Sequence, residues 1–419
     1  MANTVAILHA VQETTQCYGA LADCLAGFKY DVRPVYLPAY ATGEDEIDTR
    51  DLIRLFDRAL RQERLIDDTG KPGPAGPFSV ISHSFGSLVV RLWMELYYPR
   101  GDCPLKHHIM LAPLNFGSRL ASAGRRLPDA VFNLGRGMLQ DIELGSFFLW
   151  DLNTLYVKNA RPDQPPYQFV MAGLLPASDG KSYPKGRGEA ESDGTVRASS
   201  ANLNILRVNR RGESQEGPRT AFFVFPQYGH TGVRGLAGHI KSPGWQGDAV
   251  AERVLQCLKV EDAAAYRALC EAHYPRDLSR CQVMVRTRDQ YGRDMQDVMV
   301  EFLVDGQRCE DFILHARSDS PFNAAVFCLN AVELKARAGK VSARVSRRPH
   351  GHFHYGPGVD IPLFDRDGSI DRLRAGRTTM VEVMLTRATR GSRFDLSMSR
   401  PTAGPQDLPR GIGYESQHG

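Results

Sequence analysis

The fold is decided by the stretch Phe78-Ser79-Val80-Ile81-Ser82-His83-Ser84-Phe85-Gly86-Ser87-Leu88. Residues 78–81 form a short, mainly apolar run that predicts a buried strand, and the apolar segment from Leu88 onward predicts a buried helix. Two small residues, Ser82 and Gly86, flank Ser84 between these elements. Small neighbours are needed where a serine lies on a sharp strand-to-helix turn, because the two backbones come close there. The pattern S-x-S-x-G in this context indicates that Ser84 is a nucleophile exposed above a sheet.

The length and composition are those of an ordinary globular protein. The chain has 419 residues, which favours two or three domains at ~150 residues per domain. Hydrophobic residues make up 42% of the sequence and charged residues 24%, as is usual for globular proteins. The net charge of +4, from 52 basic and 48 acidic residues, is too small to indicate nucleic-acid binding. We therefore expect no nucleic-acid partner.

Nothing in the sequence predicts a classical export signal or a membrane span. No hydrophobic run approaches the ~20 residues that crossing a bilayer requires. The first residues lack the basic segment and long apolar stretch of a signal peptide. The eight cysteines are scattered, without a C-x-x-C pair, which favours reduced thiols over disulfides. The expected location is the cytoplasm, or the exterior after export by a route that needs no signal peptide.

Strands and helices alternate through the first half of the chain. Such alternation with short links predicts a mainly parallel sheet covered by helices on both faces, with the ligand at the carboxyl ends of the strands. One helix has Asp48 or Thr49 as a candidate N-cap. The strands are expected at residues 4–10, 30–37, 78–81, 107–111, 167–172 and 221–225, and the main helices at residues 18–28, 49–60, 88–98 and 249–258.

The alternation stops between about residues 117 and 160. This segment has a helical pattern with many large apolar residues, and it is interpreted as a cap over the active-site face. Two readings are equally favoured: the cap packs a small core of its own, or its apolar lining receives an acyl chain. The apolar residues concerned are Phe132, Leu134, Met138, Leu139, Ile142, Phe147, Phe148, Trp150 and Leu152.

The character of the sequence changes near residue 260. A helical linker is expected over residues 260–279, followed by an all-β, sandwich-like domain over residues 280–396. The tail at residues 397–419, rich in Pro, Gly and Gln, is expected to be disordered. The β domain is a candidate surface for a protein partner.

A serine nucleophile requires a general base, and the base requires a carboxylate that orients it. Ser84, Asp193 and His230 follow one another in the order Ser, Asp, His, each after a predicted strand or in its loop. Asp179 lies in a second Ser-Asp-Gly triplet and is the less favoured acid, because no apolar residue anchors it. His239 is the less favoured base.

Several segments together resemble the α/β-hydrolase superfamily, and within it bacterial lipases and lipase-like esterases. The resemblance covers about residues 3–258 and implies the α/β-hydrolase fold for residues 1–259. It implies that the amides of Phe85 and Val11 hold the oxyanion. Two departures are Ala10, where a glycine is usual after His9, and Ser82, in place of the first elbow glycine. The segments that carry the resemblance are Leu8-His9-Ala10-Val11, Ser82-His83-Ser84-Phe85-Gly86, Gly145-Ser146-Phe147-Phe148-Leu149-Trp150-Asp151-Leu152-Asn153, Ser192-Asp193-Gly194-Thr195-Val196 and Tyr228-Gly229-His230-Thr231-Gly232.

Two further groups of polar residues are weighed as metal sites. His350, His352 and His354 alternate along one strand face, yet an exposed hairpin is favoured because no fourth ligand has clear spacing. The segment 365–371 has carboxylates at spacings that a calcium loop could use, but it lacks the rest of that pattern and favours an Asp-Gly turn. His9 is favoured as a structural histidine. No metal and no cofactor are expected.

The residues and the resemblance together predict a serine esterase of lipase type. Its expected substrate is an acyl lipid, triglyceride or phospholipid, bound during transient contact with a membrane surface. The alternatives are a carboxylesterase or thioesterase for soluble acyl compounds, and a non-catalytic binding protein with a hydrolase fold. The absence of an export signal and the added β domain also fit a phospholipase-type toxin effector delivered by non-classical secretion.

Overall fold

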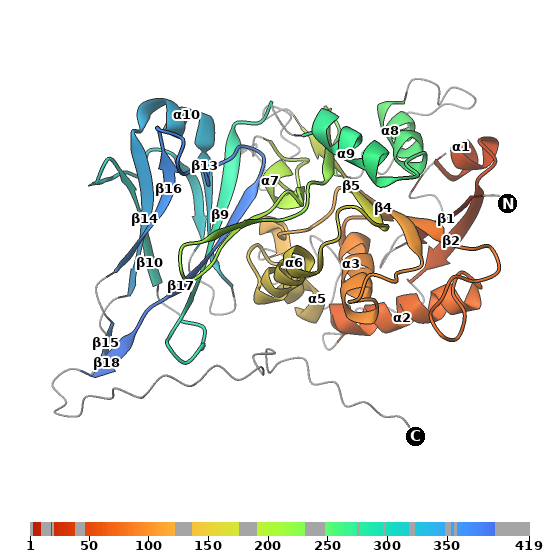
Figure 1. Ribbon diagram of the computed structural model, residues 1–419, viewed down its shortest axis with the longest axis horizontal. Coiled ribbons are helices and arrows are strands. Elements are labelled where there is room, and N and C mark those ends of the chain that lie inside the picture. The colour runs from red at the N-terminus through yellow and green to blue at the C-terminus, as the bar shows by residue number, and fades with distance from the viewer. Residues whose placement is uncertain are drawn as a thin grey trace.

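The computed structural model divides into an N-terminal α/β unit and a C-terminal β unit that lie side by side (Figure 1). The described residues are 3–9, 18, 21–37, 47–121, 136–175, 191–230, 248–274, 277–295, 298–317, 323–347, 353–355 and 358–389.

The N-terminal unit is built on a six-stranded sheet with the strand order β2-β1-β3-β4-β5-β8. Every neighbouring pair in it is parallel, which confirms the predicted parallel sheet. Because all strands except the edge strand β2 are largely buried on both sides, they read as almost continuous apolar runs. The strands are β1 (Thr4–His9), β2 (Asp31–Tyr36), β3 (Phe78–His83), β4 (Leu105–Leu111), β5 (Tyr167–Leu174) and β8 (Ala221–Pro226).

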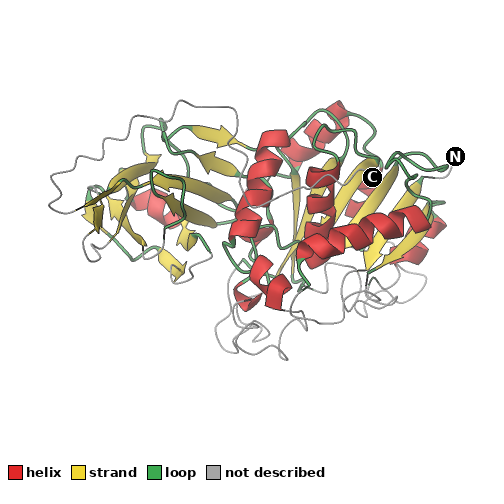
Figure 2. Cartoon of the chain, turned by 90° about the horizontal axis from the view of Figure 1, so that it is seen from below, coloured by secondary structure: helices red, strands yellow, loops and turns green. Residues whose placement is uncertain are grey.

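Helices cover both faces of this sheet, as Figure 2 shows. Alternate residues of the strands point to opposite faces, so Val80 belongs to one apolar core and its neighbour Ile81 to the other. The first core lies under α2 (Thr49–Gln62), α3 (Phe85–Tyr97), α5 (Arg136–Asp141) and α6 (Phe147–Asn159). The second lies under α1 (Leu21–Gly27), α8 (Ala249–Leu258) and α9 (Ala263–Ala272).

The predicted cap at 117–160 is described only in part. In that part, Ser146 is the N-cap of α6, and its hydroxyl accepts a hydrogen bond from the Leu149 amide. The helix packs against α3. Trp150 is 2% exposed and joins the main core of the N-terminal unit. Most of the described apolar residues of this segment therefore pack in the main core rather than in a separate small core. Phe147 instead lies against the Arg286 guanidinium, whose Cζ is 4.2 Å from its ring centroid. Phe132 and Leu134 lie outside the described residues.

The C-terminal unit consists of two sheets packed around a third apolar core. Antiparallel pairs predominate, and the strand orders are β11-β10-β14-β16 and β12-β13-β9-β17-β6-β7. A short helix, α10 (Ala331–Arg337), lies within the segment predicted to be all β. The strands are β9 (Arg280–Arg288), β10 (Val298–Val304), β11 (Gln307–Arg308), β12 (Ile313–Arg317), β13 (Ala325–Asn330), β14 (Lys340–Arg347), β16 (Val359–Asp365) and β17 (Thr378–Met384), with β15 (Phe353–Tyr355) and β18 (Arg387–Thr389) as a separate pair.

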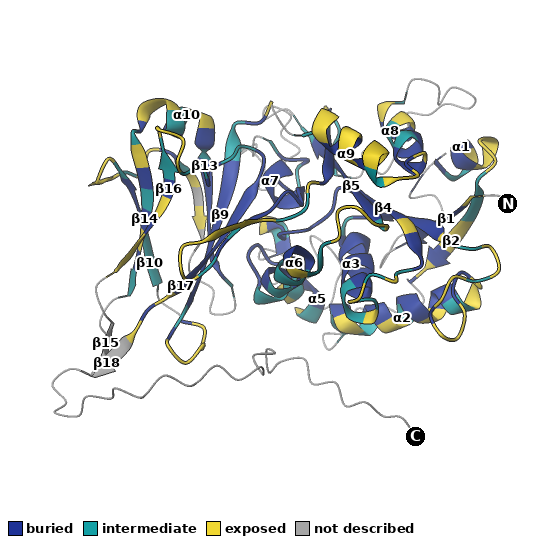
Figure 3. Cartoon of the chain, in the orientation of Figure 1, coloured by how far each residue is buried: buried dark blue, intermediate teal, exposed yellow. Residues whose placement is uncertain are grey.

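The boundary drawn at residue 259 does not separate the two units cleanly. The hairpin of β6 (Leu206–Val208) and β7 (Ser214–Glu216) precedes that boundary, yet β6 pairs in parallel with β17. The first apolar core also continues into the C-terminal unit through Met284, Val326 and Met380. Figure 3 shows buried residues running across this junction. The two units are thus joined by a shared sheet and a shared core.

Two further findings bear on the sequence predictions. Seven cysteines in the described part of the chain are free thiols. Across the described ranges, no helix is both long and apolar enough to pass through a membrane.

Candidate active site

The turn between β3 and α3 holds Ser84 in a strained backbone conformation. Its φ of 51° and ψ of −122° lie outside the regions that side-chain-bearing residues usually adopt. Such strain persists only where the surroundings enforce it: here the Ser84 amide donates to the carbonyl oxygen of Leu111, and α3 starts at the next residue. Ser84 is half-buried at the carboxyl end of β3, which is the position expected of an exposed nucleophile.

A buried polar cluster supports this turn from below. The Ser82 hydroxyl lies 2.8 Å from Nε2 of His108 and donates to the Ser87 hydroxyl at 3.0 Å. Burial lowers the pKa of the His108 imidazole to about 3, so its ring is neutral at physiological pH. Ser82, the departure from the elbow glycine, therefore ties the end of β3 to β4 and to the first turn of α3.

Asp193 is held by its own loop. One carboxyl oxygen, Oδ1, accepts hydrogen bonds from the amides of Thr195 at 2.8 Å and Val196 at 2.7 Å. The Asp193 amide donates back to the Val196 carbonyl oxygen. The side chain is almost fully buried, and the second carboxyl oxygen, Oδ2, is left to face His230.

His230 links this carboxyl group to Ser84. Its Nδ1 lies 2.8 Å from Oδ2 of Asp193, and its Nε2 lies 2.8 Å from Oγ of Ser84. The His230 amide also donates to the Asp193 carbonyl oxygen at 2.9 Å. The structure therefore brings together the three residues singled out in the sequence, in one continuous chain of hydrogen bonds that can move a proton from the serine hydroxyl to the imidazole.

Of the two predicted oxyanion residues, one can be placed. Phe85 is the first residue of α3, and the first four amides of a helix have no acceptor within it, so its N–H is available beside Ser84. Val11 lies outside the described residues. His9, just before that segment, is 4% exposed and stacks on Tyr36 with ring centroids 4.6 Å apart; this packing fits the structural role expected of it.

Several alternative candidates lie outside the described residues. They are the alternative acid Asp179, the alternative base His239, and the candidate metal ligands His350 and His352. Among the described residues, no group of three His, Cys, Asp or Glu side chains is placed to hold a metal ion. The segment 365–371 forms a tight turn, with the Gly368 amide donating to the Asp365 carbonyl oxygen.

Two residues at the site were not singled out from the sequence. The Nε2 atom of His83 lies 3.0 Å from the His230 carbonyl oxygen. Glu191, two residues before Asp193, contacts the start of β9 through its carboxyl group. The position of His83 inside the elbow pattern could have indicated the first contact. No local pattern indicates the Glu191 contact, because its partners Ser279 and Arg280 lie 88 and 89 positions further along the chain.

Known structures are similar to this chain to different degrees. Phospholipase PlaB from Legionella pneumophila aligns with a TM-score of 0.78 and 24% identity, over 96% of this chain and 98% of PlaB. The same enzyme in complex with thio-NAD aligns with a TM-score of 0.77 and 23% identity over the same shares. The mature lipase BlEst2 from Bacillus licheniformis aligns with a TM-score of 0.41 and 13% identity, over 62% of this chain and 93% of that one. No protein-family model and no curated protein matches the sequence.

This chain has an α/β-hydrolase fold. The likeness to PlaB spans nearly the full length of both chains, so it extends beyond the parallel sheet into the C-terminal unit.

Proposed function

We propose that this protein is a serine-dependent carboxylic ester hydrolase of lipase type. The observation that carries the proposal is the chain of hydrogen bonds from Asp193 through His230 to Ser84, with both distances at 2.8 Å. Ser84 stands on a strained turn at the carboxyl end of a central strand. This combination activates a serine hydroxyl that would otherwise be a weak nucleophile at neutral pH.

The proposed reaction has two halves. Ser84 Oγ attacks the ester carbonyl carbon while His230 Nε2 accepts the hydroxyl proton, and the resulting oxyanion accepts a hydrogen bond from the Phe85 amide. Collapse of the tetrahedral intermediate expels the alcohol, which takes the proton from His230, and leaves an acyl-serine. A water molecule then attacks this acyl group, with His230 again accepting the proton. His230 returns this proton to Ser84 Oγ as the bond between the acyl carbon and Oγ breaks and the carboxylic acid leaves. Asp193 keeps Nδ1 of His230 protonated throughout.

The proposed substrate is an acyl lipid, and a phospholipid is favoured over a triglyceride. The support is the likeness in fold to a phospholipase over 96% of the chain. Transient contact with a membrane surface belongs to the same proposal, because a phospholipid substrate is reached at such a surface.

A substrate panel tests this proposal. Release of fatty acid is measured from phosphatidylcholine and phosphatidylglycerol vesicles, from a triglyceride emulsion and from a soluble butyrate ester, with the wild type and Ser84→Ala side by side. The proposal predicts turnover of the phospholipids that Ser84→Ala abolishes. Turnover of the soluble ester alone would instead select a carboxylesterase, and inertness towards every ester would select a non-catalytic binding protein.

A further inference from the structure

The loop that carries Asp193 is attached to the C-terminal unit by Glu191. Oε1 of Glu191 accepts hydrogen bonds from both the amide and the hydroxyl group of Ser279, each at 2.6 Å. Oε2 accepts a third from the Arg280 amide at 3.1 Å. Arg280 is the first residue of β9, so one side chain of the N-terminal unit caps the entry into a central strand of the other unit.

The backbone of Glu191 indicates that this contact is enforced. Its φ is 57°, in the left-handed region that costs free energy for any residue with a β-carbon. The Glu191 carbonyl oxygen accepts a hydrogen bond from the Ala198 amide at 2.8 Å. That bond closes the loop around Asp193, so the same residue both shapes the loop and attaches it.

The other side of the contact is fixed within the C-terminal unit. The Ser279 carbonyl oxygen accepts hydrogen bonds from the first two amides of α10, those of Ala331 and Val332. The Gly376 amide donates to the Arg280 carbonyl oxygen at 2.7 Å. Ser279 and Arg280 therefore present their donors to Glu191 from a rigid base.

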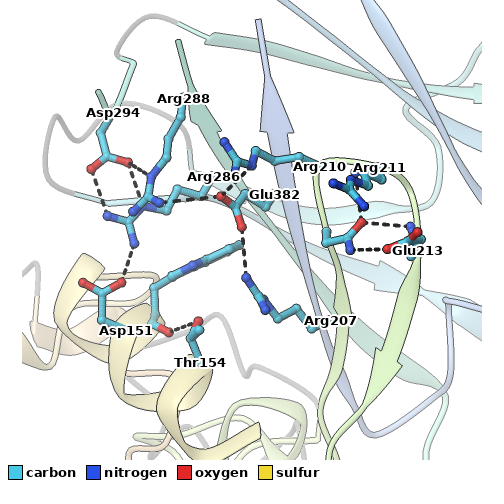
Figure 4. A network of polar contacts seen from close by, with 12 residues as sticks. Asp151, Thr154, Arg207, Arg210, Arg211, Glu213, Arg286, Arg288, Asp294 and Glu382 are labelled. Carbon is cyan, nitrogen blue, oxygen red and sulfur yellow. Dashed lines mark hydrogen bonds and ion pairs between the residues drawn. The ribbon is translucent and has the colours of Figure 1, made fainter. Parts of the chain in front are cut away.

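Further contacts between the units flank this one. The Thr378 hydroxyl donates to the Ser199 carbonyl oxygen at 2.8 Å, immediately after the Asp193 loop. On α6, Asp151 pairs at 2.6 Å with Arg286 of β9, which also pairs with Asp294 (Figure 4). Of these contacts, the one at Glu191 lies nearest to Asp193 along the chain.

We propose that Glu191 is a positioning residue, through which the C-terminal unit sets the position of Asp193 and hence the orientation of His230. The inference rests on the proposed function, because the effect is read out in ester hydrolysis. Displacement of a reacting group by about 1 Å can cost roughly 10²-fold in rate. The C-terminal unit thus affects catalysis through the loop that carries Asp193.

The test compares Glu191→Ala with a matched control, Arg372→Met. Arg372 is 9% exposed and its guanidinium also donates three hydrogen bonds, two to Ser214 and Gly212 of the β6–β7 hairpin and one to the carbonyl oxygen of Pro362 in β16. None of the three reaches the Asp193 loop. We expect Glu191→Ala to lower kcat by about 10- to 100-fold with KM within about twofold. Arg372→Met should lower thermal stability at least as much while kcat stays within about twofold.

A double mutant separates positioning from general destabilisation. If Glu191 acts through Asp193, then Glu191→Ala added to Asp193→Asn should lower kcat further by less than about threefold. Glu191→Gln still accepts hydrogen bonds from Ser279, so its kcat should be higher than that of Glu191→Ala. It should stay below the wild type, because the glutamine NH₂ group faces the Arg280 amide and two donors cannot form a hydrogen bond. Full multiplication of the two losses, or a folded Glu191→Ala protein with kcat within about threefold of the wild type, would overturn the inference.

Two controls keep the test decisive. If Glu191→Ala does not fold, Ser279→Ala, which removes one of the three hydrogen bonds, is measured in its place. A loss of kcat of about 3- to 10-fold supports the inference, and an unchanged kcat overturns it. A wild type that hydrolyses no ester would refute the proposed function itself, whereas an active wild type with an unaffected Glu191 variant refutes only the positioning role.

Discussion

The Nε2 atom of His83 lies 3.0 Å from the main-chain carbonyl oxygen of His230. A carbonyl oxygen only accepts hydrogen bonds, so Nε2 of His83 is the donor. The two rings also lie close, with centroids 4.9 Å apart. The residue directly before Ser84 therefore holds the loop of the candidate base, so the proposed nucleophile and the loop of its proposed base are positioned by two consecutive residues at the end of β3.

Loss of this contact should slow turnover. We expect His83→Ala to lower kcat by about tenfold, because the His230 loop loses a fixed point, while His83→Gln, which keeps a donor, should lose less. Steady-state kinetics on a single ester substrate measure both variants. A kcat for His83→Ala within about twofold of the wild type would show that the loop is held without His83.

Asp193→Asn should lower kcat by roughly 10³- to 10⁴-fold, because an amide in this place favours the wrong tautomer of His230. Asp179→Asn is the control, and its kcat should stay within about threefold of the wild type. Both proteins are assayed on the same substrate. The reverse ranking would move the role of the acid to Asp179, and two mild variants would assign it to a different residue.

The buried His108 makes stability depend on pH. Its pKa falls from 6.5 to about 3 in the folded protein, so between these values the unfolded chain binds a proton that the folded chain does not. The free energy of unfolding therefore falls as the pH falls through this window. Burial raises the pKa of Asp141 to about 6, so between about pH 4 and 6 the folded chain binds a proton there that the unfolded chain does not. The contribution of Asp141 to the free energy of unfolding therefore rises as the pH falls through this window.

The variant His108→Gln isolates this effect, because Asp141 is the same in both proteins and glutamine can still donate to Ser82. Between pH 6.5 and 5, the wild type should lose about 1.5 kcal/mol more of its free energy of unfolding than the variant does. Urea unfolding at the two pH values gives the difference. Parallel losses in the two proteins would mean that folding does not lower the pKa of His108.

Trp150 should matter for stability. Its side chain is 2% exposed in the core beneath α6, so Trp150→Ala should cost about 3–5 kcal/mol through lost contacts and a residual cavity. Phe148 is half-buried, and Phe148→Ala should cost less. Thermal unfolding of the two variants tests the ranking. A larger loss for Phe148→Ala would mean that Phe148, and not Trp150, is the side chain buried in the main core.

Much of the fold follows from local patterns in the sequence. Asp48 caps α2 and forms a capping box with Asp51, as its position before an amphipathic helix predicts. The helix α8 spans the predicted residues 249–258. The order Ser84, Asp193, His230 predicted the hydrogen-bonded group that the structure shows, because each residue ends a strand or follows one.

Other features depend on contacts that local patterns do not encode. The hairpin at residues 206–216 was not predicted, since its strands have only three residues each and β6 gains its partner β17 from a segment more than 170 positions away. The contact of Glu191 with Ser279 also joins residues far apart in the sequence, so no local pattern predicts it. In the sequence, the apolar residues of α6 fit the lining of an acyl-chain site and a packed core equally well. Their packing against α3 favours the core.

Labelling with a fluorophosphonate tests directly whether Ser84 is a nucleophile activated by His230. A fluorophosphonate reacts covalently with such a serine, and peptide mass spectrometry locates the adduct. We expect one adduct, on the peptide that contains Ser84. It should be absent in Ser84→Ala and form at least about 10³-fold more slowly in His230→Ala. A folded wild type that forms no adduct, or an adduct that persists in Ser84→Ala, would contradict this assignment of the nucleophile.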